Sequence, residues 1–293
     1  MAQGHVGRRF LPASGRLPNG GLLVVAAPAA TFELPKLTIF SRLAGSFTMS
    51  WITNTLTSSI GRKIIMALTG LFLCSFLVIH LSGNLQLFKH DNGLAFNAYS
   101  EFMSHNTIIR ILEWGLVLGF GGHIVQGLVL YFKNRSARSV GYVVNHSEQN
   151  SSWTSRSMAL LGTIILFFLV VHLYNFFGQL RYTDVAVDAN GNENAYALVV
   201  SSFKNPWYVA LYVVAQLALL YHLVHGFASA FHTLGLNHRK YTPLIKAVGY
   251  GFSVVVAAGF ASFPLYFLLF TDANGELVGS APQAIQSLML AFR

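Results

Sequence analysis

The sequence predicts an all-α integral membrane protein with five membrane-spanning helices, the first four of which form a bundle. Composition is the first observation behind this prediction. Hydrophobic residues make up 54% of the 293 residues and charged residues only 10%, whereas a soluble domain has roughly 25% charged residues. The second observation is that five segments reach the roughly 20 mostly apolar residues that a helix needs to cross a bilayer. These segments lie at about residues 63–84, 108–131, 157–179, 207–231 and 247–270.

The charges between these spans predict how the chain crosses the membrane. A net charge of +9 would suit nucleic acid, but the basic residues lie in loops between apolar segments. This distribution favours membrane topology over a nucleic-acid partner, because lysine and arginine concentrate on the cytoplasmic side. The loops with excess basic charge contain Arg62 and Lys63, then Lys133, Arg135, Arg138 and Arg156, then Arg239, Lys240 and Lys246. We therefore expect a cytoplasmic N-terminus and a C-terminus outside.

The membrane domain is expected at residues 49–271, with a short segment on either side. Residues 1–48 have a basic start but only a short, proline-broken apolar run, so we expect a disordered extension or a misassigned start. The stretch "MSWITNTLTSSIGRK" from Met49 resembles a natural start. Residues 272–293 form a polar tail, in which "PQAIQSLMLAF" is typical of a short interfacial helix.

Cysteine usage narrows the chemistry of the chain. Cys74 is the single cysteine, so no disulfide can form within the chain. The sequence also contains no CxxCH motif, which excludes covalent attachment of a c-type haem.

Histidines recur in the first four spans and are absent from the fifth. They are His80, His123, His172 and, in the fourth span, His222 or His225. A helix rises 1.5 Å per residue, so His80 and His172 lie roughly 25 Å and 22 Å from the inner ends of their spans. The second and fourth spans run in the opposite direction, which places His123 and both fourth-span histidines in the inner half. The sequence therefore predicts two pairs at two depths, His80 with His172 and His123 with His225 or His222.

Paired histidines on facing helices suit a haem iron with two axial imidazoles. Cofactor sites in helical bundles are built from side chains on facing helices. A single membrane histidine is often only an interhelical hydrogen bonder, but four in two depth-matched pairs favour two b-type haems. Zinc is disfavoured, because there is no HExxH motif and no acidic ligand nearby. A proton relay would need acids within the spans, and only Glu113 lies in one.

Three stretches resemble the cytochrome b subunit of succinate:quinone oxidoreductases, the succinate dehydrogenases and fumarate reductases. They are "TGLFLCSFLVIHLSGN", "FFLVVHLYNFF" and "HLVHGFASAFHTLG", and the resemblance covers about Met49 to Phe270. The most similar type has one five-helix polypeptide and two b haems. The resemblance implies His80 and His172 as ligands of the outer haem and His123 and His225 as ligands of the inner haem. His225 is preferred to His222 because the family's ligand is followed by glycine.

The resemblance also suggests further site residues, and the sequence departs from it at one of them. The stretch "SSFKNPW" makes Lys204 a candidate partner of a haem propionate. In one branch of the family a glutamate two residues before the fourth ligand transfers protons, but Leu223 occupies that position here. Glu101 is a rough counterpart of an acid at the quinone site, although a solvated loop acid is the plainer interpretation.

The implied partners are an FAD-bearing flavoprotein subunit and an iron–sulfur subunit on the cytoplasmic side. This chain lacks both GxGxxG and a cysteine cluster, so it cannot bind their cofactors. The resemblance implies electron transfer through the two haems to menaquinone or another quinone, in a bacterial cytoplasmic membrane. The direction, succinate oxidation or fumarate reduction, stays open.

Two other functions remain open from the sequence. One is the cytochrome b subunit of a hydrogenase or formate dehydrogenase. The other is a haem-free membrane transporter or scaffold.

Overall fold

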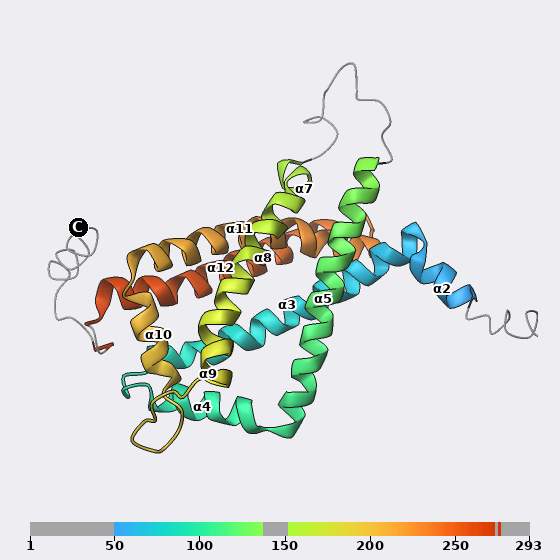
Figure 1. Ribbon diagram of the computed structural model, residues 1–293. Coiled ribbons are helices and arrows are strands. Elements are labelled where there is room, and N and C mark those ends of the chain that lie inside the picture. The colour runs from blue at the N-terminus through green and yellow to red at the C-terminus, as the bar shows by residue number, and fades with distance from the viewer. Residues whose placement is uncertain (1–49, 137–151, 273–274, 277–293) are drawn as a thin grey trace, which may run out of the picture. The chain divides into compact units, whose positions relative to one another are not determined.

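The fold is all-α, as predicted. The computed structural model describes residues 50–136, 152–272 and 275–276 (Figure 1), and in these ranges helices are joined by turns, with one isolated antiparallel bridge between Val187 and Glu193. The helices are α2 (Ser50–Thr57), α3 (Ser59–Asn84), the 3-10 turn η1 (Leu85–Phe88), α4 (Leu94–His105), α5 (Thr107–Ser136), α7 (Trp153–Arg156), α8 (Met158–His172), the π-helix η2 (Leu173–Gly178), α9 (Gln179–Tyr182), α10 (Ala195–Phe203), α11 (Pro206–Thr233) and α12 (Thr242–Phe270). The expectations for residues 1–48 and for most of the 272–293 tail lie outside the described residues.

The five predicted spans are confirmed as five helices long and apolar enough to cross a membrane within the described ranges. They run over Ser59–Phe88, Thr107–Ser136, Met158–Tyr182, Pro206–Thr233 and Thr242–Phe270. Most ends extend a few residues beyond the predicted ranges, because caps rather than hydropathy set them. Asn205 caps α11 through its side chain and Pro206 occupies the first turn, an arrangement that favours helix initiation.

Four of the spans form a ring, in the order α3, α5, α8 and α11. Each contacts its neighbours in this order, and α11 closes the ring against α3. The fifth span, α12, lies outside the ring and packs against α11 and α3; Figure 1 shows α11 and α12 side by side. Two glycines bring α12 close. A Cβ at Gly249 would lie 2.7 Å from the Phe227 ring of α11, and one at Gly259 would lie 2.9 Å from Leu81 of α3, as is common between membrane helices.

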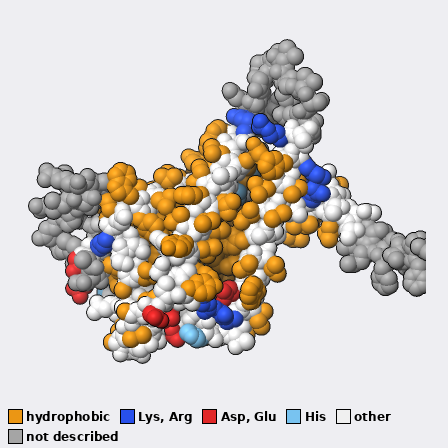
Figure 2. All heavy atoms as spheres, viewed as in Figure 1, with side chains coloured by type: hydrophobic (Ala, Val, Ile, Leu, Met, Phe, Trp, Pro, Cys, Tyr) orange, Lys and Arg blue, Asp and Glu red, His pale blue; other side chains and the backbone are white. Residues whose placement is uncertain are grey.

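Side-chain burial is uneven along this ring. The main cluster of buried hydrophobic residues gathers around α10, the first turns of α11 and the last turns of α12. In contrast, α5 contains no buried residue, and Figure 2 shows a hollow bounded by hydrophobic side chains between α5 and α8. The ring therefore has a tightly packed end and a loosely filled middle.

Charge divides the two ends of the spans. Every Asp and Glu in the described ranges lies at the end where α3 finishes and α11 begins, which we call the predicted outer end. Lys63, Lys133 and Lys246 lie at the opposite, predicted inner end, as do Arg62 and Arg135. Lys89, Arg110, Arg181 and Lys204 lie at the outer end, so Lys and Arg are in excess at the inner end rather than confined to it. This excess agrees with the positive-inside rule, and the orientation itself stays a prediction.

The predicted outer end is closed by two short helices, α4 and α10, that the hydropathy pattern did not reveal. Asn97 of α4 is fully buried. Its amide donates to Asp188 at 3.1 Å and Asn194 at 3.2 Å, and its carbonyl oxygen accepts from the Tyr196 N–H at 2.8 Å. One buried side chain thus joins α4 to the loop that precedes α10.

Gly93 generates a stability prediction at this junction. It precedes α4 with φ 80°, and a Cβ there would lie 2.1 Å from the Tyr196 ring. Gly93→Ala combines left-handed strain with a steric overlap, so we expect it to lower the free energy of unfolding by more than about 2 kcal/mol. Thermal unfolding of the purified chain in detergent measures the effect.

Gly191→Ala is the matched control. Gly191 has φ 84° but open space around its Cβ position, so it should cost only the strain, about 1 kcal/mol. Equal losses for the two variants would contradict the packing described for Gly93.

Candidate functional site

The histidines of the four-helix ring meet in two pairs. The His80 and His172 rings have centroids 5.9 Å apart, and the His123 and His222 rings 6.2 Å apart. Both pairs join diagonal helices, α3 with α8 and α5 with α11, whose backbones have little contact with one another. The imidazoles therefore face each other across the interior of the ring.

This spacing matches two imidazoles on one metal ion. A metal–imidazole nitrogen distance of about 2 Å puts the two nitrogens about 4 Å apart and the ring centroids about 6 Å apart. Both measured separations lie near that value. No group of three or more His, Cys, Asp or Glu side chains converges on a metal site within the described ranges. Each pair thus offers two protein ligands, the number that a haem iron needs beyond its macrocycle.

Hydrogen bonds at Nδ1 fix the orientation of the rings. The Thr69 hydroxyl lies 3.2 Å from His123 Nδ1 and donates its one proton to the Ile65 carbonyl at 2.8 Å. A hydroxyl has a single proton, so a Thr69 hydroxyl that donates to Ile65 accepts from Nδ1–H. This contact selects the tautomer whose Nε2 lone pair is free to bind a metal.

His172 has an equivalent partner in Tyr212 of α11. The Tyr212 hydroxyl lies 2.9 Å from His172 Nδ1 and 3.1 Å from the Tyr208 hydroxyl. It can therefore accept from the imidazole while donating to Tyr208. The contact of His80 is weaker, with the Asn84 amide 3.5 Å from Nδ1. His222 Nδ1 is buried without a hydrogen-bond partner among the described residues.

Aromatic rings pack around the outer pair. Phe76 stacks on His80 and Phe168 on His172, with centroids 5.2 Å and 5.5 Å apart. The chain directly after His172 forms the π-helix, in which Phe176 lies 5.4 Å from the His172 ring. π-Helical turns are rare in proteins overall, and those that occur are often found at functional sites. Hydropathy does not reveal them.

The resemblance and the geometry point to different second ligands for the inner pair. His222 faces His123, whereas His225 lines a separate cavity at the predicted inner end. The two lie three residues apart on α11, and therefore about 60° apart around the helix. The assignment of His225 as a ligand stays a prediction, and the ring contact favours His222.

Lys204 lies just after α10, and its ammonium group meets the end of α12. Nζ donates to the backbone carbonyls of Phe267 and Thr271 and, at 2.8 Å, to the Thr271 hydroxyl. Phe267 lies in the last turn of α12 and Thr271 directly follows the helix, where carbonyl oxygens favour a cationic donor. Burial lowers the pKa of Lys204, and nearby Asp272 offsets part of that effect. The predicted propionate contact is untested, but the structure gives this ammonium group other partners.

Glu101 lies on α4 beside His105. Its carboxylate is 3.1 Å from His105 Nδ1 and partly exposed, and it does not contact either histidine pair.

Sequence reasoning missed Tyr212 and Thr69, which contact His172 and His123 respectively. A tyrosine in the middle of a span is a usable signal, because a buried hydroxyl usually finds a hydrogen-bond partner.

Comparison with known families bears on this arrangement. Residues 133–260 match the family described as succinate dehydrogenase/fumarate reductase transmembrane subunit. This match supports the resemblance to that membrane-anchor family which the histidine motifs carry. No curated protein and no solved structure gives a significant match to the chain.

A match to a transmembrane-subunit family is consistent with the five apolar helices of a multi-pass membrane protein. Members of the matched family are subunits of an enzyme complex. The matched segment contains His172, His222, His225 and Lys204, whereas His80 and His123 precede it. The first half of each histidine pair therefore comes from outside the matched segment.

The contacts of Lys204 generate a second prediction. Lys204→Gln leaves carbonyls at the end of α12 without their charged donor, so we expect a loss of about 1–3 kcal/mol in the free energy of unfolding. Thermal unfolding in detergent measures the loss. Lys89→Gln is the control, because Lys89 is an exposed lysine at the same end with one side-chain contact, to Gln86. A loss no greater than that of the control would contradict the capping role.

Proposed function

We propose that this chain is the cytochrome b membrane anchor of a succinate dehydrogenase or fumarate reductase, passing electrons between an iron–sulfur subunit and a quinone. The observation that supports this proposal most directly is the two diagonal histidine pairs, spaced for axial ligation of two b haems. Bound haem would supply reversible one-electron chemistry at each pair. The proposed location is a bacterial cytoplasmic membrane.

The residues present fit two haems. His80 and His172 would hold the outer haem, and His123 would hold the inner one together with His222 or His225. The Nδ1 contacts of His123 and His172 leave Nε2 free. The surroundings are apolar, and Gly70 of α3 lies beside His123, where a Cβ would be 3.4 Å from the imidazole. We favour His222 on its contact with His123, and His225 is the alternative from the resemblance.

The chain's own groups have distinct tasks in this proposal. Tyr212 and Thr69 orient two of the imidazoles and raise their basicity as ligands through the Nδ1 contacts. Phe76, Phe168 and Phe260 pack against the outer pair and exclude water from it. A low dielectric around a redox group influences its potential.

The proposed partners are a flavoprotein subunit and an iron–sulfur subunit on the cytoplasmic side, with menaquinone or another quinone as the reacting substrate. Basic residues at the predicted inner end, such as Arg239 and Lys240, would face these partners, although positive-inside topology alone also accounts for them. Glu101 is proposed at the quinone site on the resemblance only, and its nearest charged partner is His105.

The haem ligands lead to a third prediction. The purified chain should contain two b haems, detected by a reduced-minus-oxidised difference spectrum with haem quantitation. His222→Ala should remove one haem, because it deletes the ring that faces His123, whereas His225→Ala should retain both. The reverse result would restore His225 as the ligand, and a haem-free chain would contradict the proposal.

The reductant identifies the complex in the same experiment. In native membranes succinate should reduce these haems, whereas hydrogen and formate should not. Reduction by hydrogen or formate alone would favour the other membrane oxidoreductases.

Tyr212 provides the fourth prediction. Tyr212→Phe removes the acceptor at His172 Nδ1, which makes that imidazole a weaker donor to iron, so we expect the potential of the outer haem to rise by several tens of millivolts. Redox titration followed by the haem absorption measures the shift. Tyr208→Phe is the control, because Tyr208 contacts the Tyr212 hydroxyl and its hydroxyl makes no contact with His172. Equal shifts in the two variants would contradict the positioning role of Tyr212.

A further inference from the structure

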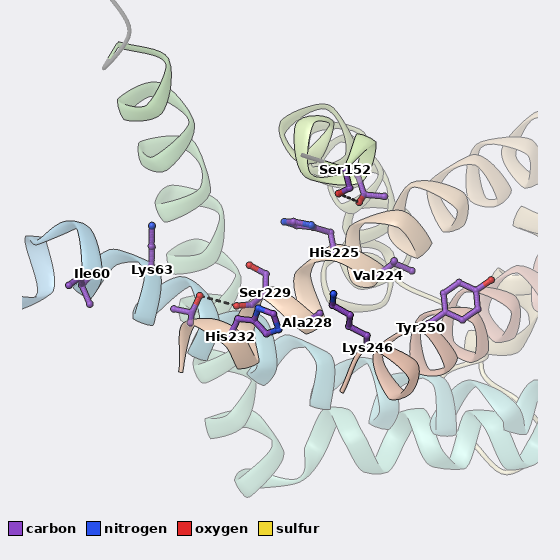
Figure 3. A pocket seen from close by; sticks show the side chains of 12 residues that line it. Ile60, Lys63, Ser152, Val224, His225, Ala228, Ser229, His232, Lys246 and Tyr250 are labelled. Carbon is purple, nitrogen blue, oxygen red and sulfur yellow. Dashed lines mark hydrogen bonds between the residues drawn. The ribbon is translucent and has the colours of Figure 1, made fainter. Parts of the chain in front are cut away.

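A cavity of about 800 Å³ lies at the predicted inner end of the spans. Figure 3 shows that its lining side chains come from α3, the start of α7, α11 and α12. It differs in character from the histidine pairs, because its wall combines basic and hydroxyl groups with apolar ones. The residues that matter below are Ile60, Lys63, His225, His232, Lys246 and Tyr250.

Four basic side chains line this cavity, and no acidic side chain among the described residues does. Lys63 and Lys246 are exposed, and neither has an ion pair or hydrogen bond within the described part of the chain. His232 Nε2 is buried without a hydrogen-bond partner there. Unsatisfied buried polar atoms are uncommon in native proteins, and a bound group would satisfy this one. The cavity is therefore suited to an anion that accepts from several donors.

The cavity is separate from the proposed haem sites. No residue of α5 lines it, and neither do His123 and His222. Lys246 and Tyr250 belong to α12, which lies outside the four-helix ring. His225 lines it because His225 is turned about 60° from His222 around α11. A carboxylate from a haem inside the ring is therefore not the expected occupant.

The residues at the rim of the cavity and its volume indicate which kind of anion it can bind. Ile60 and Tyr250 are 73% and 61% exposed and lie in helices that span the membrane, so they can contact acyl chains. The volume is in the range of pockets that hold whole organic ligands rather than a single small ion. Basic pockets between membrane helices on the cytoplasmic side are known to bind anionic lipid headgroups.

We propose that this cavity binds the phosphate-bearing headgroup of an anionic phospholipid from the leaflet at this end. Lys63 and Lys246 contact the phosphate, and His225 and His232 donate to its oxygens. Ile60 and Tyr250 lie beside the first methylene groups of the acyl chains. The proposal requires the membrane placement of the helices but not the presence of haem.

The test uses the full chain in phosphatidylcholine nanodiscs with increasing fractions of phosphatidylglycerol, and native mass spectrometry counts the retained phosphatidylglycerol. A basic group near a membrane surface contributes enough that removing it weakens binding about fivefold. We therefore expect a loss of about fivefold for Lys63→Gln or Lys246→Gln and about 25-fold for the double variant. Lys133→Gln is the control, because Lys133 lies at the same end on α5 and does not line the cavity.

A second measurement needs no variant. A photoactivatable phosphatidylglycerol added to the wild-type chain should label peptides that contain Ile60 or Tyr250.

The proposal would be overturned if the double variant retained as much phosphatidylglycerol as Lys133→Gln. It would also be overturned if the photoactivatable lipid labelled only other peptides.

Two further results would assign the cavity to another occupant and overturn the lipid proposal. One is displacement of phosphatidylglycerol by millimolar inorganic phosphate, which would indicate a free phosphate site. The other is a changed haem content in the double variant with unchanged lipid retention, which would indicate a haem propionate. The amount of phosphatidylglycerol retained can be measured whether or not the chain contains haem, so this test is independent of the proposed function.

Discussion

The structure depends on how four imidazoles are satisfied inside an apolar bundle. A polar ring at membrane depth is costly unless it has partners, and here each ring faces another across the interior while Thr69, Tyr212 or Asn84 contacts three of them at Nδ1. Contacts between neighbouring helices close the ring and leave α3 opposite α8 and α5 opposite α11, whose backbones scarcely meet. The histidine pairs make contacts along both of these diagonals.

Much of this arrangement could be predicted from the sequence, because two of its determinants are periodic or compositional. Hydropathy gave the five spans, and the rise per residue assigned His80 and His172 to one depth and His123 to another. Depth could not separate His222 from His225, since both fit. That distinction depends on rotation about the helix axis, and the structure turns His222 toward His123.

The features that sequence reasoning missed are set by tertiary contacts. The short helices α4 and α10 have no membrane-length apolar run, and they depend on the buried amide of Asn97. The π-helix after His172 has no compositional signature that distinguishes it from the α-helix before it. Lys204 stays a candidate propionate partner on the resemblance, and in the structure its ammonium group contacts the carbonyl oxygens of Phe267 and Thr271.

The diagonal pairing also has a consequence for biogenesis. The chain is inserted span by span, so the ring is built in chronological order. His80 and His172 are both present once the third span has entered the membrane, whereas His123 must wait for the fourth. The two histidine pairs are therefore completed one after the other. When only three spans have entered the membrane, His80 can already meet His172, whereas His123 still lacks its partner on α11.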